Sequence, residues 1–324
     1  MSAATSKYGT DMTITHLVTH SGGFHADELL SSVILTRLYP DATILRSRDP
    51  EWISASPDRI VYDVGREYDA AQQVFDHHQR PAPSREDGQP YSSFGLIWKH
   101  YGLAYLEAMG VPEEHRGDVH FKMDTGFVLP IDLMDNGAME PSVAGPLAGL
   151  TLPVLLETLK PVFDDRGDGA DDAAFANALI VARSFVEASV RGKHAKLRAS
   201  DMVKDAITSA GTGRVLELPM GMPFRSAVEE TGADRLLFVV HPRDADWALT
   251  GIRVSGDSFE QRANLPEAWA GLTDEALEAA SGVKGAKFCH NGRFIAVASS
   301  REAILKMAEI AVTAAEADTA AHVG

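Results

Sequence analysis

Cysteine is nearly absent from this chain, because Cys289 is the only one among 324 residues. A single thiol cannot form an intramolecular disulfide, and no metal site can be built here from several thiolates. Residues 1–13 also lack the apolar segment of a signal peptide and the arginines of a transit peptide. A disulfide-stabilised secreted protein is therefore excluded, and we expect a protein of the reducing cytoplasm.

Positive charge is also scarce. The chain has 30 lysines and arginines against 46 aspartates and glutamates, which gives a formal net charge of -16 at pH 7. Proteins that bind duplex nucleic acid usually present a basic face that displaces counterions from the phosphates, so this balance argues against that class. Aromatic residues make up only 7% of the chain, which argues against an extended platform for stacking bases.

Three further signals are missing. We find no apolar run long enough to span a bilayer, so we expect no membrane contact. There is no Walker loop and no Gly-x-Gly-x-x-Gly fingerprint, and the short run His20-Ser21-Gly22-Gly23 cannot cradle a dinucleotide. Nucleotide-dependent motors and dinucleotide-dependent dehydrogenases are therefore disfavoured.

The length exceeds that of a usual single domain, and 45% hydrophobic residues can furnish two cores. We expect residues 1–165 to form an α/β domain with a mainly parallel sheet flanked by helices. Residues 166–209 should form an acidic loop and a long connecting helix, and residues 210–324 a smaller α+β domain. The connecting helix is indicated by apolar residues at helical spacing, namely Phe175, Leu179, Ala182 and Val186.

The second domain mixes strand and helix patterns. Three β-branched and apolar runs indicate strands over 214–218, 236–240 and 248–254. Asn291-Gly292 lies between two apolar runs and is typical of a hairpin turn. The pattern over 301–315 predicts a closing helix.

In the first domain, acidic and imidazole side chains recur where predicted strands end. Asp76-His77-His78 follows the apolar run Val74-Phe75, and Asp63 follows the strand 59–62. The strand 14–19 runs into a glycine turn and then a helix, and this turn carries three such residues, namely His20, His25 and Asp27. Because ligands of open α/β sheets bind beyond the carboxyl ends of the strands, we expect these side chains to converge.

A fourth cluster places Asp132, Asp135 and Asn136 on one helical face. Taken singly, each motif has an ordinary explanation as a turn former, a helix cap or a solvated loop. Their conjunction predicts a metal centre. Imidazoles and carboxylates suit Mn²⁺, Mg²⁺, Zn²⁺ or Fe²⁺, and there are enough of them for two ions that share a carboxylate.

The order of these motifs resembles the DHH phosphoesterase superfamily, and within it the Myg family of metal-dependent exonucleases. The motifs that carry the resemblance are His-x4-His-x-Asp from His20, Asp-Val-Gly from Asp63, Asp-His-His-Gln-Arg from Asp76 and Ile-Asp-x-x-Asp-Asn-Gly from Ile131. Three segments near the C-terminus are similar to the second domain of that family, namely 258–262, 265–272 and 288–295.

The resemblance implies a set of ligands, with Asp63 as the carboxylate shared by two ions and Asp132 preferred over Asp135. The implied metal ligands are His20, His25, Asp27, Asp63, His77 and Asp132. Two features differ from the wider superfamily. His25 stands where an aspartate is commoner, with a longer spacing from His20, and no Gly-Gly-Gly-His motif is visible in the C-terminal half.

The expected catalytic residues are Asp63, His78 and Arg80. His78 would face the substrate and stabilise or protonate the leaving oxygen, while Arg80 could clamp a phosphate through paired hydrogen bonds. Candidates for binding substrate are His78, Arg80, Asn136, Arg253, Arg262 and Arg293, with Lys287 as a further cation of the second domain. For each arginine, a solvated surface charge is the competing explanation.

The resemblance implies a phosphodiester hydrolase that uses two divalent ions, Mn²⁺ first and Mg²⁺ or Zn²⁺ as alternatives. Its expected substrate is RNA or single-stranded DNA, degraded in the 3′–5′ direction. A strand end entering a metal cleft needs less basic surface than a duplex, so the net charge permits this function. Two alternatives stay open, namely a hydrolase of a small phosphate compound such as a dinucleotide or pyrophosphate, and a non-catalytic binding protein stabilised by metal. A homo-oligomer is also left open.

Overall fold

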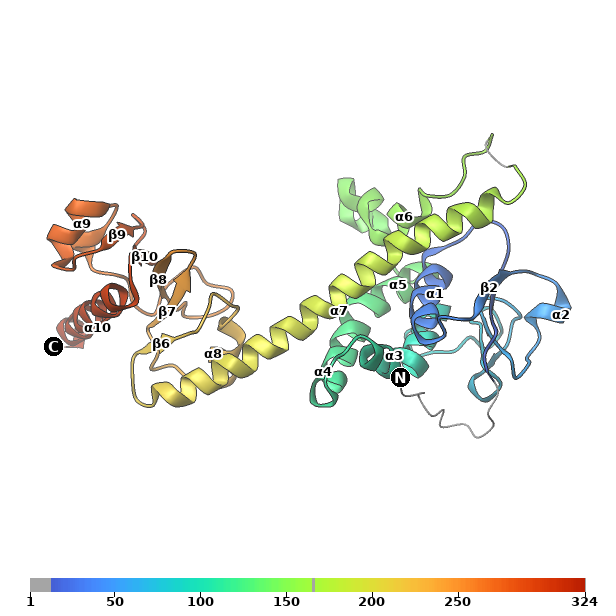
Figure 1. Ribbon diagram of the computed structural model, residues 1–324, viewed down its shortest axis with the longest axis horizontal. Coiled ribbons are helices and arrows are strands. Elements are labelled where there is room, and N and C mark those ends of the chain that lie inside the picture. The colour runs from blue at the N-terminus through green and yellow to red at the C-terminus, as the bar shows by residue number, and fades with distance from the viewer. Residues whose placement is uncertain (1–12, 165–166, 324) are drawn as a thin grey trace. The chain divides into compact units, whose positions relative to one another are not determined.

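The computed structural model describes residues 13–164 and 167–323 (Figure 1). The chain divides into two compact units, and the boundary between them falls at His194. This boundary lies inside the long helix α7 (Ala170–Ala210). The helix confirms the connecting element predicted from the apolar spacing. Residues 165–166, which are part of the predicted acidic loop, lie outside the described residues. Residues 1–12, for which no signal or transit peptide was expected, lie outside them as well.

The first unit contains a five-stranded sheet in the order β2-β1-β3-β5-β4. Its strands are β1 (His16–Thr19), β2 (Thr43–Arg46), β3 (Arg59–Tyr62), β4 (Tyr68–Asp69) and β5 (Val74–Phe75). β1 pairs in parallel with β2 and β3, β3 pairs in parallel with β5, and only the edge strand β4 is antiparallel. The mainly parallel sheet predicted for this part of the chain is therefore confirmed.

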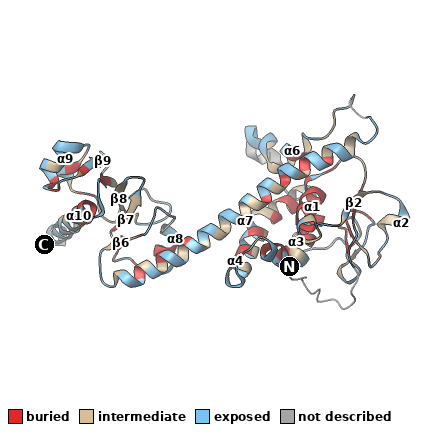
Figure 2. Ribbon diagram, viewed as in Figure 1, coloured by how far each residue is buried: buried red, intermediate tan, exposed pale blue. Residues whose placement is uncertain are grey.

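Helices cover this sheet and supply most of the core. They are α1 (Ala26–Leu38), α2 (Pro50–Ile53), α3 (Ser93–Ala108), α4 (Glu113–Met123), α5 (Leu129–Asp135) and α6 (Leu152–Glu157). Shorter turns are η1 (Ala70–Gln72), the π-helical η2 (Asp124–Val128) and η3 (Pro141–Leu150). Every residue of α1 from Ala26 to Leu35 is buried, so this part of the helix is enclosed on all sides, and the first six residues of α3 are buried as well (Figure 2).

The topology explains why the functional motifs meet. Because β1, β3 and β5 run in the same direction, their carboxyl ends lie along one edge of the sheet. His20 follows β1, Asp63 follows β3 and Asp76 follows β5. Asp63 also adopts a left-handed backbone conformation with φ 56°, which is uncommon for a residue other than glycine and is concentrated at functional sites. The sheet edge therefore presents these side chains together.

The second unit contains a separate five-stranded sheet in the order β6-β7-β8-β10-β9. Its strands are β6 (Val215–Glu217), β7 (Phe238–Arg243), β8 (Asp246–Gly251), β9 (Ala286–Cys289) and β10 (Ile295–Ala298). Only β6 and β7 are parallel. The helices are α8 (Arg225–Glu230), the short η4 (Glu267–Trp269), α9 (Asp274–Ser281) and α10 (Arg301–Val323). The predicted α+β domain, its hairpin at Asn291-Gly292 and its closing helix are present.

From the sequence we expected no apolar run long enough to span a bilayer, and the long helix α7 corrects that expectation. By length and composition α7 could cross a membrane, because an 18-residue window within it has a mean hydropathy of 1.3. Its first half, however, packs one apolar stripe into the first unit, and the buried residues of that stripe are Phe175, Ala178, Ala182, Val186 and Val190. A single helix of this kind is weak evidence for a membrane span, since core helices pass the same test.

Candidate metal centre

Asp63 lies at the centre of the converging side chains. Its Oδ2 is 3.3 Å from Nε2 of His20, and its Oδ1 is 3.3 Å from Nε2 of His77. The carboxylate is buried, and Oδ1 also accepts a hydrogen bond of 3.4 Å from the Ser93 hydroxyl. The two oxygens of one carboxylate thus face two different histidines, which is the arrangement expected of a ligand shared by two metal ions.

The first group of potential ligands surrounds His20. Glu28, fully buried in the first turn of α1, places Oε1 at 3.0 Å from Nε2 of His20. Both of its oxygens also accept hydrogen bonds from the backbone N–H of His25, at 2.8 and 2.9 Å. This contact satisfies one of the free N–H groups at the start of the helix. Glu28 therefore fixes the His20 imidazole and the backbone of His25.

The second group surrounds His77. Its Nε2 lies 3.3 Å from Oδ2 of Asp135 and 3.8 Å from Oδ2 of Asp27. Its other nitrogen, Nδ1, is 3.3 Å from Oδ1 of Asn136. A hydrogen bond on one ring nitrogen fixes the tautomer and turns the other nitrogen toward the ligand site. Asn136 thus uses its side chain to orient His77, and the contact with substrate expected from the sequence stays a prediction.

The Asp76 carboxylate organises the loop that carries the histidines. Its Oδ1 accepts hydrogen bonds from the backbone N–H of His77 and from Nδ1 of His78, both at 2.7 Å. Its Oδ2 accepts from the backbone N–H of Arg66 at 2.6 Å. These contacts hold the backbone of the loop so that the His77 side chain is buried next to Asp63, while the side chain of His78 remains 55% exposed. The geometry agrees with a substrate-facing position for His78.

Asp132, the fourth-motif ligand preferred from the sequence, lies elsewhere. Its oxygens accept hydrogen bonds from the Ser92 hydroxyl at 2.6 Å, the Gly95 N–H at 3.0 Å and an Arg85 N–H at 2.7 Å. A carboxylate at the N-terminus of α3 is stabilised by the free N–H groups and the helix dipole. The residue of this motif that joins the potential ligands is Asp135, so Asp135 replaces Asp132 in the ligand set that we propose.

Three groups of side chains within the described residues could each hold an ion, with the donor atoms of each group within 4.8 Å of one another. They are His20, His25, Glu28 and Asp63; Asp63, Asp76, His77 and His78; and Asp27, His77 and Asp135. Asp27 gives an independent indication, because neither of its buried carboxylate oxygens has a hydrogen-bond partner among the described residues. A buried, unpaired carboxylate is costly, and a divalent cation would offset that cost.

The electrostatics of the metal-free site point the same way. Burial alone would lower the pKa of His20, but hydrogen bonds to Asp63 and Glu28 outweigh it and raise the pKa to about 10. The same balance, with Asp63 and Asp135 as partners, raises the pKa of His77 to about 9. Burial and repulsion from Asp63 and Asp135 raise the pKa of Asp27. Without metal, protons on the histidines and on Asp27 thus offset the negative charge of the clustered carboxylates, which bound metal ions would otherwise neutralise.

The remaining predicted site residues are more dispersed. Arg80 is exposed, two residues beyond His78. In the second unit, Arg262 donates hydrogen bonds to the Ala233 and Leu236 carbonyls and pairs with Asp234. These contacts occupy its guanidinium within its own unit. Arg253 lies over the Phe259 ring at 4.6 Å, and Arg293 lies in the turn before β10 with φ 54°. Substrate binding by these three stays a prediction.

Two contributors to the site, Glu28 and Ser93, were not predicted from the sequence. Glu28 was visible only as the residue three positions after His25, which is the spacing of a capping box, and its contact with His20 depends on tertiary structure. Ser93 also carried no motif, yet its hydroxyl donates to Asp63 and, at 3.0 Å, to the Phe75 carbonyl. Ser93 acts on Asp63 through a hydrogen bond, while Glu28 contacts His20 and is itself a potential ligand.

Comparison with known proteins assigns the family. A family model for MYG1 exonucleases, described as an uncharacterised protein family (UPF0160), matches residues 16–312. The chain belongs to this family. It is 35% identical to the human MYG1 exonuclease, over 90% of this chain and 84% of the relative. It is 29% identical to a Schizosaccharomyces pombe MYG1 protein, over 92% and 98% of the two chains. The resemblance stated from the motifs is thereby confirmed.

Among solved structures, the chain is similar to the exonuclease RecJ from Thermus thermophilus in complex with Mn²⁺. The identity is 16% and the TM-score 0.26, and the match covers 93% of this chain and 52% of the other. A RecJ structure bound to manganese gives the same score, covering 93% and 90%. These values are too low to transfer geometry, so the ligand assignments rest on the side chains described above.

Proposed function

We propose that this member of the MYG1 exonuclease family hydrolyses phosphodiesters of RNA or single-stranded DNA with two divalent ions, removing nucleotides from the 3′ end. Family membership makes it a metal-dependent nuclease or phosphoesterase. The choice of polymer, the direction and the ion are part of the proposal. The observation that carries it is Asp63, which faces one histidine with each oxygen and belongs to two of the potential metal groups.

The donor set fits the metal ions that this chemistry needs. His20, His25, Glu28 and Asp63 would hold one ion, while Asp27, His77 and Asp135, together with the second oxygen of Asp63, would hold the other. Imidazole and carboxylate donors without thiolate suit Mn²⁺, with Mg²⁺ and Zn²⁺ as alternatives. When bound, such ions lower the pKa of a water molecule to near neutrality and polarise the phosphate oxygens.

The protein residues outside the ligand set complete the site. His78 is held at Nδ1 by Asp76, so its Nε2 is the nitrogen available to a substrate. Its pKa is raised, mainly by that hydrogen bond, and a protonated imidazole can donate a proton to the leaving oxygen. Arg80 is exposed beyond His78 and offers a guanidinium that can bind a phosphate. The cytoplasmic location expected from the sequence is kept as part of the proposal.

The test is cleavage of end-labelled single-stranded RNA and DNA with Mn²⁺, Mg²⁺, Zn²⁺ or EDTA, comparing the wild type with Asp63→Asn. We expect stepwise shortening from the 3′ end, dependent on metal and lost in Asp63→Asn, because the amide cannot supply the shared negative charge. Asp118→Asn, an exposed aspartate of α4, is the matched control and should retain full activity. Shortening from the 5′ end would retain the nuclease and reverse the direction.

A second candidate is favoured by the net charge of -16, which repels polyanions more than small anions. A dinucleotide and pyrophosphate are therefore assayed beside the polymers. Turnover of the small compounds alone would replace the exonuclease by a hydrolase of small phosphates. Metal binding without turnover of any substrate would favour the metal-stabilised binding protein.

A further inference from the structure

A pocket beside the Asp76-His77-His78 loop is not used by the metal chemistry. We propose that it binds the base and phosphate of the nucleotide next to the phosphodiester that is cleaved, with Tyr68 stacking on the base and Lys99 pairing with the phosphate. This inference rests on the proposed nuclease function. It adds a subsite that would select a nucleotide over a simple phosphate ester.

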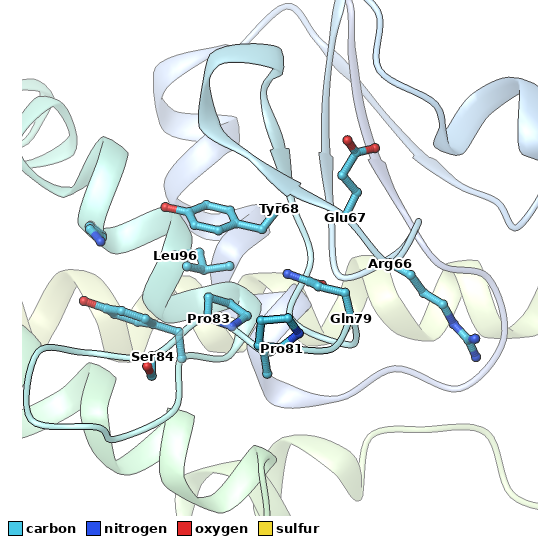
Figure 3. Close-up of a pocket in the computed structure, with 11 residues that line it drawn as sticks. Arg66, Glu67, Tyr68, Gln79, Pro81, Pro83, Ser84 and Leu96 are labelled. Carbon is cyan, nitrogen blue, oxygen red and sulfur yellow. The ribbon is translucent and has the colours of Figure 1, made fainter.

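The pocket has the size of a small-molecule site. Its volume is about 430 Å³, within the range of pockets that hold drug-sized ligands. Four parts of the first unit form its walls, namely the segment 66–68, the segment 79–84, Tyr91 and the side of α3 that carries Leu96 and Lys99. Figure 3 shows the Tyr68 ring on one side, Pro81 and Pro83 on the other, and the Gln79 amide between them.

The lining matches the chemistry of a nucleobase. Tyr68 and the two prolines offer flat apolar surfaces, on which a base can stack regardless of its identity. The Gln79 side chain donates from Nε2 to the Asp76 carbonyl at 3.0 Å. This hydrogen bond holds the Gln79 side chain against the loop, so the pocket would recognise a base by stacking and not by a specific hydrogen bond.

The charges at the pocket allow a phosphate at one position. Lys99 is exposed on α3, with Nζ 5.2 Å from the centre of the Tyr91 ring, which also lines the pocket. The ends of the Arg66 and Glu67 side chains point away from the space between Tyr68 and the prolines (Figure 3). The lysine is thus the cation best placed to pair with a phosphate held beside the stacked base.

The pocket and the metal centre are built on the same loop and share the hydrogen-bonded carboxylate of Asp76. Gln79 follows His77 by two residues, and two residues span at most about 7 Å. Asp76 connects the two sites, because one of its oxygens fixes His78 and the other accepts from the Arg66 N–H in the pocket wall. A nucleotide in the pocket would therefore lie within reach of a phosphate at the metal ions, as consecutive units of one strand do.

The test uses two single-stranded oligonucleotides that differ only in whether the nucleotide beside the cleaved bond has its base or is abasic. We expect the wild type to show a KM about tenfold higher for the abasic strand, since stacking of one base contributes about this factor. Tyr68→Leu should raise KM for the normal strand and leave the abasic strand unchanged. Tyr68→Phe, which retains the ring, should behave as the wild type does.

A second pair of variants tests the phosphate contact without touching Tyr68. Lys99→Ala should raise KM about fivefold for both strands, and Lys122→Ala, an exposed lysine of α4, serves as the matched control. Calorimetric titration of the full chain in EDTA adds a readout independent of turnover. AMP should bind more tightly than inorganic phosphate, and Tyr68→Leu and Lys99→Ala should each weaken AMP binding.

The outcomes separate this inference from the nuclease function. Equal KM values for the two strands in an active wild type, or AMP binding no better than that of phosphate, would overturn the nucleotide subsite and leave the nuclease intact. Absence of cleavage of both strands by wild type with bound metal would overturn the proposed function itself.

Discussion

Asp132 and Asp135 are three residues apart on α5, yet their carboxylates have different surroundings. Asp132 is fully buried under the start of α3, while Asp135 faces His77. Burial raises the pKa of Asp132 to about 7, although its contacts with Ser92 and Arg85 lower it. The two residues therefore have separable roles, one in stability and one at the candidate ligands.

Substitution of these two aspartates should give opposite results. Asp135→Asn should reduce bound Mn²⁺ and retain the thermal stability of the metal-free protein. Asp132→Ala should retain the ligand atoms but lower the free energy of unfolding by about 3 kcal/mol, because it leaves the half-buried Arg85 with only Asp124 in its ion pair. Elemental analysis and chemical denaturation measure the two quantities. Loss of metal only in the Asp132 variant would restore the assignment preferred from the sequence.

Sequence reasoning could identify this motif but could not choose between its two acids. Both fall on one helical face, and their spacing is compatible with either orientation. The choice depends on Ser92, Gly95 and Arg85, which are 37 to 47 residues distant in the chain. Conversely, the Asp76-His77-His78 run was recognisable because its internal hydrogen bonds are local. Its arrangement needs only a strand end and adjacent N–H groups.

His78 tests whether the exposed imidazole acts on substrate. His78→Ala should lower kcat by about a hundredfold or more, which is the usual contribution of general acid catalysis, while bound Mn²⁺ is unchanged. The measurement compares turnover with metal content in the same preparation. His290→Ala is the matched control, because His290 is an exposed histidine outside the unit that carries the candidate ligands. Loss of metal from the His78 variant would place it among the ligands.

Among the helices and strands, those that could be predicted from the sequence have a regular apolar pattern. The strands and the long helix α7 carry such a pattern, so the strand ends and the helix were located correctly. By contrast, α1 is buried on all sides from Ala26 to Leu35, so its pattern could indicate a helix but not the neighbours that enclose it. The packing of α3 against α1 and α5 brings Ser93 to Asp63, and no periodicity in the sequence encodes that approach.

Gly95 shows how tightly α3 is fitted to the site. A Cβ atom at this position would overlap the Asp132 carboxylate, whereas a Cβ at Gly117 in α4 would meet open space. Gly95→Ala should therefore lower the free energy of unfolding by about 3 kcal/mol and displace Ser93 from Asp63. Gly117→Ala should raise it by up to about 1 kcal/mol, because alanine favours a helix over glycine. Chemical denaturation and metal content measure both effects.

Equal stability of the two alanine variants would contradict this packing argument. A destabilised Gly95→Ala that still binds metal with wild-type affinity would separate the fit of α3 from the ligand geometry. It would then show that the Ser93 contact is dispensable for the site.

At the scale of the whole molecule, the two units have separate hydrophobic clusters. Phe238, Trp269 and Cys289 belong to a cluster of the second unit, and Val18 and Val61 to one of the first. The candidate ligands all lie in the first unit. Metal binding should therefore stabilise that unit selectively, by about 2.7 kcal/mol when the free ion exceeds its dissociation constant a hundredfold.

The pH dependence of this stabilisation follows from His20 and His77, whose pKa values in the metal-free protein are about 10 and about 9. A raised pKa stabilises the folded state fully below the unfolded value of about 6.5, and the contribution is lost as the pH rises through 9 and 10. Metal binding must displace these protons, so it strengthens over the same range. The difference in Tm between Mn²⁺ and EDTA should increase from pH 6.5 to pH 8.5, as followed by calorimetry.

Unfolding of the second unit can be followed separately through the buried thiol of Cys289. Labelling of this thiol by a maleimide on heating should be the same with Mn²⁺ and with EDTA. A Tm difference that shrinks with pH would mean that these histidines do not lose protons when metal binds.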